Sequence, residues 1–177
     1  MPKMTQLSDL FVKELRDMYD AEKQITKALS HLINAASSEE LRGAFEDHLD
    51  ETKAQIERLE QVFDHLEMTP RGLHCAGMAG ILEEGSALIE EDGDPAVLDA
   101  GFIGAAQRVE HYEMAAYGTL LAFARQLGLD DVATLLEQSL EEEKAADRKL
   151  SDLAEIVINP SAQQPAMTKT AGKERRR

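Results

Sequence analysis

Four long segments of this 177-residue chain repeat their apolar residues every three or four positions, which places those residues on one face of an α-helix. The four stripes span residues 11–32, 41–66, 102–127 and 136–157, and each is interrupted near its middle by acidic or other polar residues. Hydrophobic residues make up 43% of the chain but aromatic residues only 5%, which favours helices with an aliphatic core over a β-sandwich. We therefore predict an all-α fold built on four long helices.

Helix-start and helix-stop residues separate the four segments. A capping box from Ser37 to Glu40 begins the second helix, and Thr69-Pro70 ends it. Asp94 is a favourable N-cap for the third helix, Gly128 suits its C-terminal end, Asp130 suits the next N-cap, and Asn159-Pro160 ends the fourth helix. Short turns near residues 36 and 129 make each pair of helices antiparallel. The long connection, about residues 67–94, contains a shorter apolar segment over 78–89, so we predict a four-helix bundle with one long crossover containing a short extra helix.

The acidic residues outnumber the basic ones by 34 to 19, and this excess is concentrated in the predicted bundle. Residues 1–159 hold 33 acidic and 14 basic residues, a formal charge of −19, whereas residues 160–177 hold five basic residues and one acidic residue. We expect the first part to be one folded domain and the second to be a disordered basic tail. An acidic domain disfavours nucleic acid and anionic membranes as partners, and DNA protection would rest on the short tail alone.

Cysteine content and hydropathy bear on the cellular compartment. Cys75 is the single cysteine, so no internal disulfide can form, which favours a reducing environment. The chain has no apolar run of the ~18 residues needed to span a membrane. We expect a cytoplasmic protein without a membrane partner.

Four glutamates are expected at similar heights in the bundle. Glu22 and Glu51 lie 14 and 15 residues from the first turn, and Glu113 and Glu143 lie 16 and 14 residues from the second. At 1.5 Å per residue, each pair is level to within ~3 Å. We therefore expect these four carboxylates to lie near the centre of the bundle.

Further metal-ligating side chains lie one turn from these glutamates, and no Lys or Arg occupies the middle of a stripe. Buried carboxylates without basic partners need cations or protons, and two divalent ions would balance four glutamates. The predicted ligands are Glu22, His48, Glu51, Glu110, Glu113, Glu143 and Asp147. Oxygen-rich ligation with one imidazole fits two iron ions or manganese better than zinc.

Several other polar residues lie on or near the stripes. Tyr117 lies one turn after Glu113, where its phenol could bond a ligand, and Gln55 could orient a carboxylate, although both positions also suit ordinary packing. His111 points about 100° away from Glu110 around the helix, so we exclude it from the site. We predict no catalytic residue beyond the metal ligands.

Four segments of the chain resemble a known family. They are DMYDAEKQI (17–25), HLDETKAQIER (48–58), VEHYEMAAYGTL (109–120) and LEEEKAADRKL (140–150). Over about residues 5–158 the chain resembles the YciF-like (YciE/YciF) bacterial stress-response proteins of the ferritin-like superfamily. The resemblance implies a ferritin- or rubrerythrin-like bundle with a di-iron centre, a role in stress response, ferroxidase activity and a homodimer.

The resemblance also bears on individual ligands. Glu22 matches the glutamate of the first helix in that superfamily, and Glu110 and Glu113 match the pair of the third helix. Many ferritin-like sites carry Glu-x-x-His on the second and fourth helices. Here the second helix has the reverse order, His48-x-x-Glu51, and the fourth has an alanine three residues after Glu143. One metal position held by carboxylates alone is therefore plausible.

The leading functional hypothesis is a di-iron carboxylate protein that oxidises Fe(II) with dioxygen or peroxide. A manganese catalase-like enzyme is one alternative. A non-catalytic bundle that acts in stress response through self-association or partner binding is another.

Overall fold

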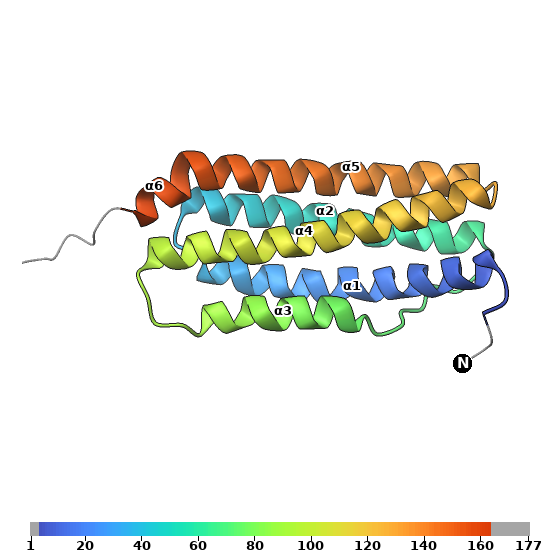
Figure 1. Ribbon diagram of the computed structural model, residues 1–177, viewed down its shortest axis with the longest axis horizontal. Helices are drawn as coiled ribbons and strands as arrows, with labels where there is room; N and C mark the ends of the chain where they lie inside the picture. Colours follow the sequence, from blue (N-terminus) through green and yellow to red (C-terminus); the bar gives the residue numbers. More distant parts are fainter. Residues whose placement is uncertain (1–3, 164–177) are drawn as a thin grey trace, which may run out of the picture.

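The computed structural model describes residues 4–163, and in that range the chain forms a bundle of four long helices (Figure 1). The helices are α1 (Leu7–Ala35), α2 (Glu39–His65), α3 (Ala76–Ile89), α4 (Pro95–Gln126), α5 (Asp130–Leu153) and α6 (Asn159–Ala162), with a π-helical turn, η1 (Ala154–Ile158), between the last two. The long helices α1, α2, α4 and α5 lie side by side, and α3 packs along α1 and α4. The predicted all-α bundle with one long crossover and a short extra helix is confirmed.

The crossover carries the chain from one end of the bundle back to the other. Figure 1 shows α4 beginning near the turn between α1 and α2, so α2 and α4 run in the same direction. The buried carboxylate of Asp99 in α4 accepts hydrogen bonds from the backbone N–H groups of Ser37 and Ser38 at 2.9 Å and from the Ser37 hydroxyl at 2.6 Å. The first turns of α4 therefore hold the α1–α2 turn in place.

The ends of α4 follow the sequence signals. Asp94 caps the helix by accepting a hydrogen bond from the Ala96 N–H at 3.0 Å, and Pro95 is the first helical residue. Gly128 lies just beyond the C-terminal end with a φ of 71°, a backbone conformation that favours glycine.

The start of α2 differs by one residue from the predicted capping box. Ser38, not Ser37, is the N-cap, and its hydroxyl oxygen accepts a hydrogen bond from the Leu41 N–H at 3.3 Å. The Glu40 carboxylate accepts a hydrogen bond from the Ser38 hydroxyl. Ser37 is unavailable as a cap because Asp99 binds it, a long-range contact that local sequence does not reveal.

The C-terminal end of the bundle also differs from the prediction. The chain continues past Asn159 and Pro160 as α6, where the missing N–H of a first-turn proline is tolerated. The wide turn η1 precedes α6 and shifts the buried position from Val157 to Ile158. Residues 164–177, most of the predicted basic tail, lie outside the described residues.

Aliphatic side chains and a few aromatic ones from the four stripes fill the core. The stripe of α1 buries Phe11, Leu15, Met18, Ile25 and Leu29. Within residues 4–163, no helix combines the length and the apolar character needed to cross a membrane.

Candidate metal centre

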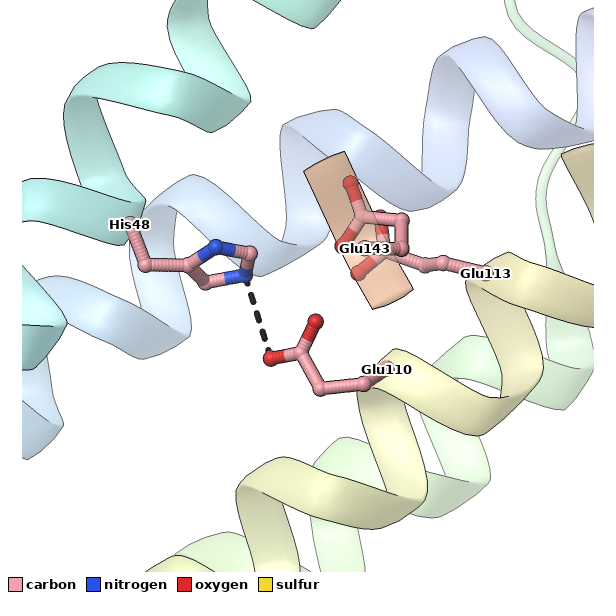
Figure 2. A group of neighbouring side chains, drawn as sticks. All are labelled: His48, Glu110, Glu113 and Glu143. Carbon is pink, nitrogen blue, oxygen red and sulfur yellow. Dashed lines mark ion pairs between the residues drawn. The ribbon is translucent and has the colours of Figure 1, made fainter. Parts of the chain in front are cut away.

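Five metal-ligating side chains meet at mid-height between the four long helices. Glu22 comes from α1, His48 from α2, Glu110 and Glu113 from α4, and Glu143 from α5. Figure 2 shows the last four pointing toward one another. Each of these four offers a ligand atom, and these atoms lie within 4.8 Å of one another. Four of the five residues occupy the inward-facing stripes, and the fifth, Glu110, lies one turn before Glu113.

The five residues are almost completely shielded from solvent. Glu22, Glu113 and Glu143 are 0% exposed, Glu110 is 1% exposed and His48 is 7% exposed. Ionised carboxylates at this depth are unfavourable unless a proton, a cation or several hydrogen bonds compensate.

Two side chains, each on a different helix from the carboxylate that it contacts, orient two of the glutamates. The Tyr117 hydroxyl donates a hydrogen bond to Oε1 of Glu22, and the Gln55 side-chain amide donates to Oε1 of Glu143. The sequence left two alternatives open at both positions, ordinary packing and a hydrogen bond to a ligand, and the structure shows the hydrogen bond. Each bond engages one oxygen and leaves the other without a hydrogen-bond partner in the described residues.

Most ligand atoms of the cluster have no hydrogen-bond partner among the described residues. These atoms are Oε2 of Glu22, Glu110 and Glu143, both carboxylate oxygens of Glu113, and both ring nitrogens of His48. The closest approach involving the imidazole places its Nε2 atom 3.2 Å from Oε1 of Glu110. Buried polar atoms are normally satisfied, so this concentration of unpaired ligand atoms is a set that a cation would fit.

The electrostatics of the cluster show that burial disfavours the ionised form of its four glutamates. Burial, followed by the charge of Glu143, raises the pKa of Glu22 and of Glu113 well above the usual value. Burial and its interaction with Glu143 raise the pKa of Glu110 as well, and burial raises the pKa of Glu143 itself. Without a cation, the folded chain holds these carboxyls partly as neutral acids.

Glu51 does not lie in the bundle centre, where its height along α2 had placed it. Its side chain is 50% exposed, and Oε2 lies 3.6 Å from Nδ1 of His48 on the outer side of the ring. Height along a helix fixes the level of a residue but not the direction in which it points. His48 and Thr52 occupy the inward face of α2, and Glu51 lies on its flank.

Asp147 also lies beside the cluster rather than in it. Its side chain is partly exposed, and Oδ1 accepts a hydrogen bond from the Gln107 amide at 3.2 Å. The same oxygen lies 3.3 Å from Nε2 of the exposed His111. His111 therefore stays outside the buried cluster, as expected, and Asp147 has partners of its own.

A buried arginine next to the cluster was missed by the sequence analysis. Arg58 is 8% exposed and forms two hydrogen bonds with the Glu142 carboxylate, at 2.8 and 2.9 Å, and one with the Ser139 hydroxyl at 2.7 Å. Its positive charge lowers the pKa of Glu22, partly offsetting the effect of burial. The available signal was spacing, because Arg58 lies three residues after the buried Gln55 and therefore close to the inward face of α2.

The donor set fits a pair of divalent ions. Four carboxylates carry four negative charges, which two divalent cations neutralise, and the neutral imidazole adds a nitrogen ligand. Carboxylate oxygens with one imidazole suit iron and manganese.

Comparison with known proteins identifies the family. A family model described as a domain of unknown function, DUF892, matches residues 6–163. The protein YciF of Escherichia coli (strain K12) is 46% identical over 164 residues, which cover 92% of this chain and 99% of YciF. In the crystal structure of the E. coli stress protein YciF, the similarity covers 91% of this chain and 100% of that chain, with a TM-score of 0.85.

A second solved structure is nearly as similar. YcfI from Rhodopseudomonas palustris, described as a candidate structural protein, is 45% identical with a TM-score of 0.83, covering 85% of this chain and 96% of that chain. The family match spans every helix that contributes to the buried cluster. The chain therefore belongs to the DUF892 family of YciF-like proteins.

Proposed function

We propose that this chain is a di-iron carboxylate protein of the ferritin-like type that oxidises Fe(II) with dioxygen or peroxide during stress. The observation that carries the proposal is the set of buried ligand atoms without hydrogen-bond partners on four facing helices. The relative YciF is called a stress protein, which supports the physiological part of the proposal.

The proposed iron ligands are the five buried side chains. Glu22, Glu110, Glu113 and Glu143 supply carboxylate oxygens, and His48 supplies one ring nitrogen. A pair of ferrous ions bound there supplies the electrons that reduce dioxygen or peroxide. Glu51 and Asp147 are left out of this set because one is half-exposed and the other is already hydrogen-bonded.

The surrounding residues hold the ligands and exclude water. Tyr117 holds one oxygen of Glu22 and Gln55 holds one oxygen of Glu143, so each carboxylate keeps its other oxygen free to bind a metal ion. Arg58 and Glu142 pair beside the cluster and keep the guanidinium away from the free oxygens. Such supporting hydrogen bonds keep ligands oriented before a metal binds.

Metal analysis followed by anaerobic titration tests the proposal. Protein purified without added metal and then titrated with Fe(II) should bind about two ions per chain, as the charge balance requires, and then change in absorbance when oxygen or peroxide is added. Binding of manganese with oxygen release from peroxide would indicate the catalase-like alternative. Absence of any metal binding would exclude both enzymes.

A non-catalytic bundle is the second candidate function. The description of YcfI as a candidate structural protein favours it. In that case the carboxyl groups stay protonated, and the chain acts through self-association or binding of a partner. Fe(II) would then neither bind nor raise the stability of the chain.

A further inference from the structure

A small cavity lies between α2 and α5 beside the proposed iron site. Its volume is about 20 Å³, enough for one water molecule. Its lining includes His48 and Glu51 from α2, Glu110 from α4, and Ala146 and Lys149 from α5. Glu51 and Lys149 are exposed, whereas His48 and Glu110 are buried. The cavity therefore lies between the surface and the site. The small side chain of Ala146 leaves this space open.

Polar groups follow one another along this cavity from the surface inward. Glu51 is half-exposed, and its Oε2 atom lies 3.6 Å from Nδ1 of His48. On the other side of the ring, Nε2 lies 3.2 Å from Oε1 of Glu110, as Figure 2 shows. Carboxylate, imidazole and carboxylate therefore form a continuous series of metal-ligating groups.

His48 itself points to a ligand at this position. It is more than nine-tenths buried, it lines the cavity, and neither ring nitrogen has a hydrogen-bond partner among the described residues. A buried imidazole that has carboxylates on both sides but makes no hydrogen bond within residues 4–163 is unusual. A cation passing between Glu51 and Glu110 would satisfy it.

The other end of the centre is less favourable for an approaching cation. Glu22 and Tyr117 are completely buried there. Farther along the same α2–α5 seam, Arg58 presents a positive charge to Ser139 and Glu142. Arg58 lies seven residues beyond Glu51, about 10 Å along the helix. Between α2 and α5, the position of Arg58 therefore presents a positive charge, whereas the position of Glu51 presents a carboxylate that no lysine or arginine of the described residues neutralises.

One basic residue lies at the mouth of the cavity. Lys149 donates a hydrogen bond to the Asp47 carboxylate at 2.7 Å, and both side chains are exposed. This pairing holds the lysine ammonium group on Asp47 and leaves the Glu51 carboxylate, whose only ion-pair partner in the described residues is His48, free to meet a cation.

We infer that this cavity is the uptake path of divalent cations, with Glu51 as the first protein group that a cation meets and His48 as the group at its inner end. The inference rests on the proposed function. In this role Glu51 accelerates loading without being a resident ligand, which is consistent with a carboxylate next to the site that is half-exposed.

Stopped-flow loading of the full-length metal-free chain with Co²⁺ tests the inference. Co²⁺ binds oxygen and nitrogen ligands and gives an absorbance signal without oxidation by air. Glu51→Gln should slow loading by about tenfold, because a focused charge raises the association rate of an opposite charge by at least that factor. The final absorbance and the number of bound ions should stay as in the unaltered chain.

Three further variants make the test specific. Glu57→Gln removes an exposed carboxylate from the same helix away from the cavity and should leave the loading rate unchanged. Lys149→Gln should speed loading roughly threefold by removing a repelling charge. Ala146→Leu should slow loading by filling the cavity. Higher salt should lower the rate of Co²⁺ loading more in the unaltered chain than in Glu51→Gln, because salt screens the charge that the variant lacks.

The possible outcomes separate the two proposals. Equal loading rates for Glu51→Gln and the unaltered chain would overturn the uptake path and leave the proposed iron site standing. Fewer bound ions or a changed spectrum in Glu51→Gln would also overturn it, because Glu51 would then be a resident ligand. Failure of the unaltered chain to bind Co²⁺ or Fe(II) would overturn both.

Discussion

The hydroxyl group of Tyr117 in α4 donates a hydrogen bond to the carboxylate of Glu22 in α1, and both side chains are completely buried. The bond joins the two hairpins of the bundle at the level of the proposed iron site. It satisfies one oxygen of Glu22, and the other oxygen has no partner in the described residues.

Replacing Tyr117 with phenylalanine should destabilise the metal-free chain by about 1–3 kcal/mol, the usual cost of leaving a buried polar group unsatisfied. Urea unfolding measures this change. Tyr19→Phe is the matched control, because the Tyr19 hydroxyl bonds the partly exposed Glu60, which water can reach after the change. The smaller loss should belong to Tyr19→Phe, and the reverse order would contradict the role assigned to Tyr117.

Replacing Glu113 with leucine should stabilise the metal-free chain and abolish loading of at least one iron. Both oxygens of Glu113 lack partners, and an apolar side chain of similar size removes the cost of burying them, by about 1–4 kcal/mol. Calorimetric unfolding with and without Fe(II) measures both effects. Glu57→Leu on the surface should change stability by no more than about 0.5 kcal/mol. Unaltered iron binding in Glu113→Leu would exclude this carboxylate as a ligand.

Stability should depend on pH in opposite ways with and without metal. The pKa values of Glu22, Glu110, Glu113 and Glu143 are raised in the folded chain, so above the ordinary value of 4.5 the folded state holds more protons than the unfolded state. Their contribution to the unfolding free energy is complete below that value and is lost as the pH rises through the raised pKa values.

Metal reverses this trend because bound ligands must be deprotonated. Urea unfolding between pH 5 and pH 8 should therefore show the metal-free chain losing stability and the iron-loaded chain gaining it. The Glu113→Leu variant should show a shallower loss in the metal-free state. A metal-free chain that becomes steadily more stable up to pH 8 would mean that the buried carboxyls are ionised and compensated by other groups.

Replacing Asp99 with alanine should destabilise the bundle by about 3 kcal/mol, because two backbone N–H groups and the Ser37 hydroxyl lose a buried charged acceptor. The number of bound ions should not change. Asp94→Ala, which removes an exposed helix cap, should cost only about 1 kcal/mol. Equal losses for the two variants would show that Asp99 does not secure the α1–α2 turn.

Helical periodicity alone predicted which residues face the core, and it succeeded for Glu22, His48, Glu113 and Glu143 because a helix of 3.6 residues per turn fixes the direction of each side chain. Counting residues from a turn fixes only height, and that argument misplaced Glu51. Arg58 was missed because its burial depends on Ser139 and Glu142 of another helix.

Other differences also arise from contacts between distant parts of the chain. Asp99 takes Ser37 out of the predicted capping box, although the two residues lie 62 positions apart. The wide turn η1 buries Ile158 in place of Val157. The spacing of the apolar residues does not predict this wide turn. Local sequence therefore predicted the helices and their faces, but not the contacts that adjust their ends.

Three of the four buried glutamates, Glu110, Glu113 and Glu143, belong to the hairpin of α4 and α5. Helices joined by a short turn pair early in folding because closing a short loop costs little entropy. These carboxylates can thus meet while water still reaches them, and the arrival of the α1–α2 hairpin removes that water. Under the proposed function, a shortage of iron would therefore affect the late joining of the two hairpins and not the formation of the helices.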